Sequence, residues 1–244
     1  MLARELFLQK RQNGVFMNNY LKPLITVMKA NINTVNATKM KSYMRNKFDY
    51  LGIKSPQRRE IMRDFIKEYG KPQQIDLTPI VEELWQLPQR EFQYCAMDIL
   101  IKNTRYLTKE DIELVEHLIM TKSWWDTVDL LASNLVGKLF QKFPELQEQY
   151  LPNWLESGNI WLQRTCLIFQ LHYKKNTDVN LLFELIDKLK DTDEFFLNKA
   201  IGWALRQYSK TDATAVIDFV RKSKLAALSQ REALKWLKKT GKIV

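Results

Sequence analysis

Apolar residues recur at intervals of three and four along most of the chain, a spacing typical of amphipathic helices. In the segment 121-TKSWWDTVDLLASNL-135 one set of side chains forms a single stripe that should face a core, because successive residues of a helix are about 100° apart. The members of that stripe are Trp124, Val128, Leu131, Leu135 and Leu139. Trp125 and Asp129 lie off the stripe and are four residues apart, so both should stand on one flank of the helix. The simplest interpretation of this flank alone is a half-buried tryptophan beside a solvated carboxylate.

Helix start signals recur along the chain. Prolines at 56, 79 and 88 fit first-turn positions, where the missing N–H has no cost. Three hydroxyl residues followed three positions later by an acid have the form of a capping box: Thr108 with Asp111, Ser123 with Asp126, and Ser229 with Glu232. The combined pattern predicts helices near 15–31, 35–50, 56–69, 79–86, 89–104, 109–121, 124–142, 145–156, 159–174, 178–189, 193–209, 212–223 and 230–240. Because the connections are short and no strand-like alternation separates them, the predicted fold class is all-α.

An internal repeat is visible when the segments 91–100, 125–135, 161–170 and 195–205 are aligned. The alignment brings Ala96, Ala132, Cys166 and Ala200 into register at spacings of 36, 34 and 34 residues. A period of this length corresponds to one helix pair of a HEAT-like array, in which each pair buries its apolar face against the next. The sequence therefore predicts a solenoid that forms a single domain over residues 1–244, with a concave groove lined by one helix of every pair.

Composition narrows the class of protein. Of the 244 residues, 45% are apolar, which is ample for a continuous core, and only 7 are Gly and 7 are Pro, which disfavours a turn-rich all-β fold. Lysine and arginine number 38 against 28 acids, a net charge of +10. That surplus favours a polyanionic partner, either nucleic acid or an anionic membrane surface.

Several kinds of chemistry lack their sequence signals. The chain has only two cysteines, Cys95 and Cys166, both in apolar helical stretches. An oxidised secreted domain usually carries more, so a reducing cytoplasm is favoured. The first residues, MLARELFLQKRQNG, interrupt their apolar positions with charges too often for a signal peptide, and no segment approaches the roughly 18 apolar residues of a membrane span. Because HExxH, CxxC, GxGxxG and GxxxxGK[ST] motifs are absent from the sequence, we expect no metal and no nucleotide cofactor. Because no apolar segment is long enough for a span, we also expect no membrane partner.

The repeat register also brings chemically active residues together. Asp129 lies three positions before the small residue of its helix and Arg164 two before that of the next, so both should project at nearly the same level. Trp125 and Trp203 belong to the same helical layer. Two indole faces beside a carboxylate would attract a cation. Purines alkylated at N3 or N7 are cationic, and loss of such a base passes through a sugar with oxocarbenium character that Asp129 could stabilise.

If the groove holds DNA, its phosphates would meet positive side chains and helix starts. The candidates are Arg45, Lys47, Ser55, Arg58, Arg59 and Arg231. Taken singly, each charged residue is more typical of a solvated surface.

Five segments then carry a resemblance to a known family. They are 43-YMRNKFDYLGIKSPQRRE-60, 122-KSWWDTVD-129, 159-NIWLQRTCLIFQLHYKK-175, 194-EFFLNKAIGWALRQYSKT-211 and 228-LSQREALKWLKK-239. In this order they closely resemble the AlkD-type DNA alkylation repair glycosylases over residues 30 to 240. The resemblance implies a right-handed superhelical solenoid of HEAT-like repeats that wraps duplex DNA in a basic concave groove. It also implies excision of positively charged N3- and N7-alkylpurines without a cofactor and without extruding the base. Residues 1–15 lie outside it, and we assign them no role.

The resemblance also implies roles for individual residues. Asp129 matches the catalytic acid, Trp125 and Trp203 the aromatic pair at the lesion, and Arg164 the arginine that accompanies the acid at the DNA backbone. Two further residues match by position: Tyr43 an aromatic near the lesion, and Arg206 a DNA-binding residue that could support the acid. One branch of the superfamily lacks some of these residues and does not act as a glycosylase, whereas this sequence retains the tryptophans, the aspartate and Arg164.

We therefore expect a cytoplasmic, monofunctional alkylpurine DNA glycosylase that associates with the nucleoid when it acts on DNA. A solenoid around DNA can work as a monomer. A non-catalytic HEAT-repeat protein that binds unusual DNA structures, and a helical scaffold for another protein, are the alternatives. The sequence leaves open 3-methyladenine, 7-methylguanine and bulkier adducts as substrates, and both base-catalysed and dissociative attack by water.

Overall fold

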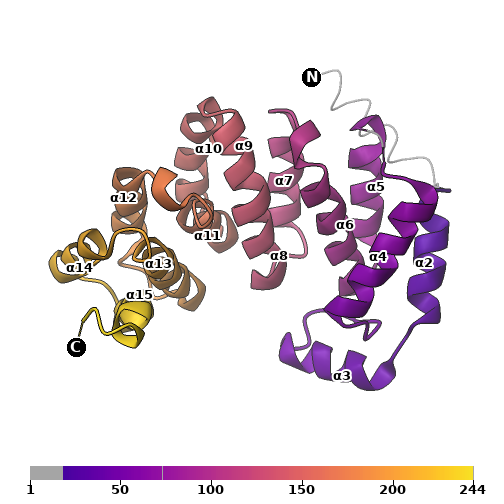
Figure 1. Ribbon diagram of the computed structural model, residues 1–244, viewed down its shortest axis with the longest axis horizontal. Helices are drawn as coiled ribbons and strands as arrows, with labels where there is room; N and C mark the ends of the chain where they lie inside the picture. The colour runs from indigo at the N-terminus through magenta and orange to yellow at the C-terminus, as the bar shows by residue number, and fades with distance from the viewer. Residues whose placement is uncertain (1–18, 73, 244) are drawn as a thin grey trace. The chain divides into compact units, whose positions relative to one another are not determined.

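The computed structural model describes residues 19–72 and 74–243 (Figure 1). Within them the regular structure is helical, with a single bridge between Asp49 and Gln89. The all-α fold class is therefore confirmed. The chain forms two compact units, residues 1–96 and 97–244, and the single domain over 1–244 stays a prediction. No helix of the described part is both long and apolar enough to cross a membrane. Residues 1–15, and the first residues of the helix predicted from 15, lie outside the described ranges.

The first unit contains α2 (Leu21–Ala30), α3 (Thr34–Tyr43), α4 (Ser55–Tyr69), α5 (Gln74–Gln86) and the start of α6 (Arg90–Lys102). Helices α2 and α4 lie side by side (Figure 1). Their apolar faces form a core in which Leu24 and Met28 of α2 and Met62 and Phe65 of α4 are buried. Helix α5 begins five residues before Pro79, where the sequence had predicted its first turn.

The loop between α3 and α4 is held by a buried acid. The prediction extended α3 to residue 50, but the helix ends at Tyr43 because Arg45 and Asn46 adopt left-handed backbone angles, with φ of 54° and 58°. Beyond them, the fully buried carboxylate of Glu91 accepts hydrogen bonds from three consecutive backbone N–H groups, those of residues 51–53, at 2.8 to 3.1 Å. This arrangement satisfies N–H groups that would otherwise be unpaired in a buried loop.

The second unit is also helical. Its elements are η1 (Thr104–Tyr106), α7 (Asp111–Met120), α8 (Trp125–Leu130), the π-helical turn η2 (Leu131–Val136), α9 (Gly137–Lys142), α10 (Glu145–Glu156), α11 (Ile160–Ile168), η3 (Lys174–Asn176), α12 (Val179–Leu189), α13 (Phe195–Tyr208), α14 (Ala213–Lys222) and α15 (Ala227–Lys239). Helix α13 packs against both α11 and α15.

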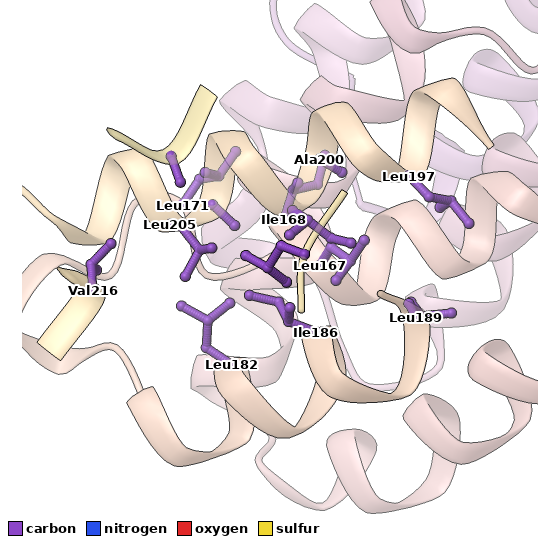
Figure 2. Close-up of a cluster of buried hydrophobic side chains, with 14 of the residues drawn as sticks. Leu167, Ile168, Leu171, Leu182, Ile186, Leu189, Leu197, Ala200, Leu205 and Val216 are labelled. Atoms are coloured by element: carbon purple, nitrogen blue, oxygen red, sulfur yellow. The ribbon is translucent and has the colours of Figure 1, made fainter. Parts of the chain in front are cut away.

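Figure 2 shows the core of this unit, built from the inward faces of α11 to α15. Leu167, Ile186 and Ile201 are at most 1% exposed. The four small residues of the repeat, Ala96, Ala132, Cys166 and Ala200, are all buried in their helices. The apolar stripe from Trp124 to Leu139 is buried as predicted.

The observed first residues of the helices show that two of the three predicted capping boxes are wrong. Thr108 donates its backbone N–H to the Asp111 carboxylate at 2.6 Å, as half of a capping box would require. Ser123 instead donates its hydroxyl to the carbonyl oxygen of Ile119, and α8 begins at Trp125 without a side-chain cap. Ser229 and Glu232 lie inside α15, which begins at Ala227. Both side chains are used for packing against α13, and the local pattern alone did not reveal this.

Candidate active site

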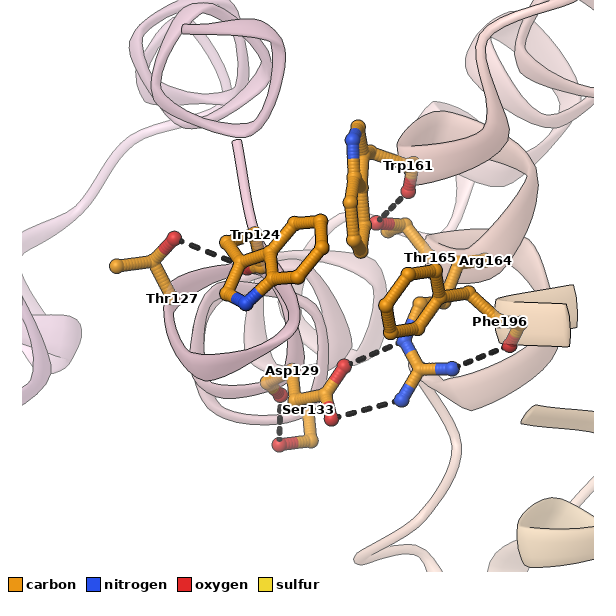
Figure 3. A network of polar contacts seen from close by, with 8 residues as sticks. All are labelled: Trp124, Thr127, Asp129, Ser133, Trp161, Arg164, Thr165 and Phe196. Carbon is orange, nitrogen blue, oxygen red and sulfur yellow. Dashed lines mark hydrogen bonds and ion pairs between the residues drawn. The ribbon is translucent and has the colours of Figure 1, made fainter. Parts of the chain in front are cut away.

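An ion pair between α8 and α11 forms the centre of the candidate site (Figure 3). Arg164 donates from Nε and Nη2 to the two carboxylate oxygens of Asp129, at 2.6 and 2.8 Å. Its Nη1 donates to the carbonyl oxygen of Phe196 in the first turn of α13. One guanidinium therefore joins three helices of the second unit. The equal levels predicted for Asp129 and Arg164 from the repeat register agree with this contact.

The pair is largely withdrawn from water. The Arg164 side chain is 5% exposed and that of Asp129 is 15% exposed. Burial raises the pKa of Asp129 above its ordinary value of 3.8, while the hydrogen bonds and positive charge of Arg164 act in the opposite direction. The neighbouring Asp126 adds a smaller effect that also raises this pKa. The expectation of a solvated carboxylate on this flank is therefore wrong.

Three aromatic rings surround one side of the pair. Trp124 and Trp161 have ring centroids 5.6 Å apart, and each ring lies 5.0 Å from that of Phe196. The rings come from the start of α8, the start of α11 and the start of α13. Sequence reasoning placed Trp124 in the core stripe but missed Trp161 and Phe196, although both occur in the segments that carry the family resemblance. Such rings exclude water and strengthen the attraction between buried charges.

A π-helical turn begins two residues after Asp129. The sequence predicted one continuous helix over 124–142, but residues 131–136 form a π-helical turn between α8 and α9. The Ser133 hydroxyl donates to the backbone oxygen of Asp129 at 2.7 Å, and the Asn134 amide donates to that of Leu130 at 3.1 Å. Single π turns within α-helices are frequent at functional sites. Here the turn lies next to the residue with the strongest expected role.

A close backbone approach follows the π turn. A Cβ atom on Gly137 would lie 2.4 Å from the backbone oxygen of Phe169. Tyr173, beyond the end of α11, donates its hydroxyl to the backbone oxygen of Gly137 at 2.5 Å. These contacts tie α9 to the region after α11. Because Trp124 also contacts Trp161 at the starts of α8 and α11, the two segments are held together on both sides of the ion pair.

The two tryptophans expected at the lesion are both in the second unit. Trp125 is the first residue of α8, and Trp203 lies in α13, partly buried against the core cluster of Figure 2. Both side chains are intermediate in exposure, so each leaves part of its indole accessible. Their contact with a lesion nucleotide stays a prediction.

Arg206 and Arg231 are also in the second unit. Arg206 donates to Glu232 of α15 at 2.6 Å. The acid that it supports is therefore on α15 and is not Asp129 of α8. Arg231 is exposed on α15.

The remaining expected DNA contacts are in the first unit. Tyr43, Arg45 and Lys47 are exposed at and after the end of α3, and Ser55 and Arg59 are exposed in the first turns of α4. Arg58 differs from them because it is buried, with its guanidinium 5.2 Å from the ring centroid of Tyr94. Tyr43 and Tyr94 line a shallow hollow of about 250 Å³ together with Tyr50. Phosphate contacts for these residues stay predictions.

Most of the chain matches the model of one protein family. The family model described as DNA alkylation repair enzyme matches residues 24–237, nearly the whole chain. The chain belongs to the DNA alkylation repair enzyme family. Membership supports an enzyme with a role in DNA alkylation repair and indicates DNA as the partner.

A solved structure agrees with this membership. A protein from Enterococcus faecalis, described as a predicted DNA alkylation repair enzyme, is 33% identical and superposes with a TM-score of 0.75. The match covers 86% of this chain and 98% of that chain. No curated protein gives a significant match. The α-helical array of this alkylation repair family member is therefore shared with a relative of nearly the same extent.

Proposed function

We propose that this alkylation repair family member is a monofunctional DNA glycosylase that excises positively charged N3- and N7-alkylpurines from duplex DNA. The reaction needs no cofactor and leaves the damaged base in the helical stack. Asp129 stabilises the positive charge that develops on the deoxyribose, and Trp125 and Trp203 contact the lesion nucleotide. Arg164 holds the acid in place, and positive side chains of both units contact phosphates.

The observation that carries this proposal is the geometry of the Asp129 carboxylate. Two of its roughly four acceptor positions are used by Arg164, and its remaining 15% exposure leaves a small accessible part. A carboxylate fixed in a poorly hydrated site needs little reorganisation when charge develops nearby, and such preorganised groups contribute about 3 to 4 kcal/mol each to transition-state stabilisation. Asp129 is therefore suited to a cationic sugar.

The proposed step balances without an acid catalyst. The C1′–N bond of the alkylated nucleotide breaks, and its electron pair neutralises the positive base that leaves. Water adds to C1′ and gives its proton to Asp129 or to solvent, which leaves an abasic site. Because the departing base is neutral, a single carboxylate is enough, whereas ordinary glycoside hydrolysis uses two.

The main alternative is a non-catalytic protein that binds unusual DNA structures. The observation in its favour is the ion pair itself, because a carboxylate bonded through both oxygens to a buried arginine is also a common structural element. Both functions predict salt-sensitive affinity for duplex DNA. Only the glycosylase predicts release of a free base.

The decisive experiment incubates the purified protein with methylated duplex DNA and measures released 7-methylguanine and 3-methyladenine. We expect release above the spontaneous rate. DNA retention without release would overturn the glycosylase and favour the binding protein, and failure to bind duplex DNA at moderate salt would favour a scaffold for another protein.

A variant that removes both charges of the ion pair separates loss of base release from loss of stability. Asp129→Asn alone leaves the buried Arg164 without a counter-charge, which can cost about 3 kcal/mol. The double variant Asp129→Asn, Arg164→Gln removes both charges, so it should unfold at a higher temperature than the single variant and still release no base. Release by a folded double variant at the wild-type rate would contradict the role of Asp129.

A further inference from the structure

One face of α13 carries two cations on either side of Trp203. Lys199 is four residues before Trp203 and Arg206 is three residues after it, so the three side chains lie along one face of the helix. Lys199 is 37% exposed and Arg206 is 25% exposed. Both cations are therefore accessible beside an indole that we expect at the lesion nucleotide.

A single carboxylate from α15 holds both cations. Glu232 accepts from Lys199 Nζ at 2.9 Å through one oxygen and from Arg206 Nη1 at 2.6 Å through the other. The hydrogen bond from Lys199 holds the pKa of Glu232 below its usual value. Burial acts in the opposite direction, but the charge of Lys199 and the contact with Arg206 add to the lowering, so the acid is ionised at neutral pH. The two positive groups therefore converge on one point of α15.

The backbone of α13 is shaped for this contact. A Cβ atom on Gly202 would lie 2.5 Å from Cβ of Glu232 and 2.8 Å from the backbone oxygen of Ser229. One turn earlier, the Ser229 hydroxyl lies 2.9 Å from Oδ1 of Asn198, which joins the same two helices. Glu232 is itself only 11% exposed. The acid is thus fixed by packing, and it in turn restrains two long side chains that are otherwise mobile.

We infer that Glu232 is a positioning residue that aims Lys199 and Arg206 together at one backbone phosphate next to the nucleotide on Trp203. This inference rests on the proposed function for the identity of that nucleotide. Lysine has three donors and arginine five, so the single contact that each makes with Glu232 leaves donors for a phosphate. Glu232 does not touch DNA. Because Glu232 already restrains the two cations, they lose less conformational entropy when they bind the phosphate.

The direction in which one substitution changes DNA affinity distinguishes a positioning role from a simple electrostatic effect. Removing an acid from a DNA-binding surface raises its positive potential, which should tighten DNA binding and make it more salt-dependent. Loss of a positioning residue has the opposite effect, because released cations form a weaker phosphate contact. The variant Glu232→Gln keeps the shape of the side chain and removes its charge, so it tests this sign directly.

We expect Glu232→Gln to bind undamaged duplex DNA about tenfold more weakly, as for one lost charge-assisted hydrogen bond, with the salt slope reduced by about 0.9, as for one phosphate. The KM for base release should rise while kcat changes little, because the Asp129 pair is separate. The matched control is Glu184→Gln on α12, which removes an exposed acid from an ion pair with Lys188 and should leave DNA affinity unchanged. Tighter binding by Glu232→Gln, or unchanged affinity, would overturn the inference.

A second variant covers the case in which Glu232→Gln unfolds. Lys199→Gln removes one cation at a partly exposed position and should itself weaken DNA binding. When both variants fold, a double-mutant cycle should show that their effects are not additive, whereas additive effects would mean that Glu232 does not act through Lys199. DNA binding is measured without chemistry, so wild-type protein that binds DNA but releases no base would refute the glycosylase alone. If Lys199→Gln binds DNA as tightly as the wild type does, the inference is refuted and the glycosylase is not.

Discussion

At the scale of single residues, Asp129 has two opposing influences on its proton. Burial favours the neutral acid and Arg164 favours the carboxylate, and the net effect is a raised pKa. Since the folded protein holds this proton more tightly than the unfolded chain does, the contribution of Asp129 to stability falls as pH rises from the ordinary value toward the raised one. The proposed activity has the opposite dependence, because it needs the charged form.

A pH profile of base release checks this assignment. We expect the single-turnover rate to fall on the acid side with an apparent pKa above 3.8, the ordinary value for aspartate. The rate should be measured on DNA whose spontaneous depurination at each pH has been subtracted. A rate that stays constant down to pH values well below that of an ordinary aspartate would show that the ionisation of Asp129 does not limit the reaction.

The residue scale also shows what the sequence could predict. The contact between Asp129 and Arg164 followed from small residues spaced at one helix pair, because equivalent levels of neighbouring helices come together in a repeat. The bond from Arg164 to the backbone of Phe196 could not be predicted, since it depends on where α13 begins and carries no side-chain signal. Glu232 was interpreted as a helix cap because its spacing from Ser229 fits both a capping box and a buried helix interface.

At the scale of elements, helices with long apolar periodicities were predicted well, but the residues at which helices end were not. Helix α10 spans Glu145–Glu156, as predicted. The π turn after Asp129 interrupts a helix whose apolar stripe is continuous in sequence, so periodicity alone does not reveal it. Helix α3 ends early because of left-handed residues that are neither Gly nor Pro, and the buried Glu91 that holds the following loop is distant in sequence.

The contact of α13 with α15 gives a prediction at this scale. Gly202→Ala would place a methyl group 2.5 Å from Glu232 Cβ, so α15 must shift. We expect a loss of about 1 to 3 kcal/mol in the free energy of unfolding, as for overpacking, measured by urea denaturation. In an exposed helix the same change stabilises by about 1 kcal/mol. A gain in stability would therefore mean that the two helices do not approach so closely.

At the scale of the whole molecule, the helical fold was predicted from sequence, and family membership supports DNA as the partner. Periodicity with few Gly and Pro was enough for the fold class. The right-handed superhelix and its basic concave groove stay predictions, because the sequence pattern does not specify the angle between helix pairs and small differences in this angle accumulate along an array. Charge alone left nucleic acid and membrane surfaces equally open, and specific residue patterns were needed to choose between them.

The net charge of +10 leads to a prediction about DNA affinity. If the protein engages six or more phosphates, its affinity for undamaged duplex should fall about a thousandfold or more between roughly 50 and 200 mM salt. Fluorescence anisotropy over this range gives the slope. Arg231→Gln should reduce the slope by about 0.9 if Arg231 contacts a phosphate. Affinity that hardly changes with salt would contradict a phosphate-contacting surface of this size.

The most direct test of the central claim is the single-turnover rate of 7-methylguanine release from methylated duplex DNA by wild-type protein and by Asp129→Asn. We expect the substitution to lower the rate by about 100-fold or more, with DNA affinity changed far less. Asp126→Asn, which removes an acid one turn earlier on α8, should retain a rate within severalfold of the wild type. Equal rates for wild type and a folded Asp129→Asn would contradict the proposal that this carboxylate drives base excision.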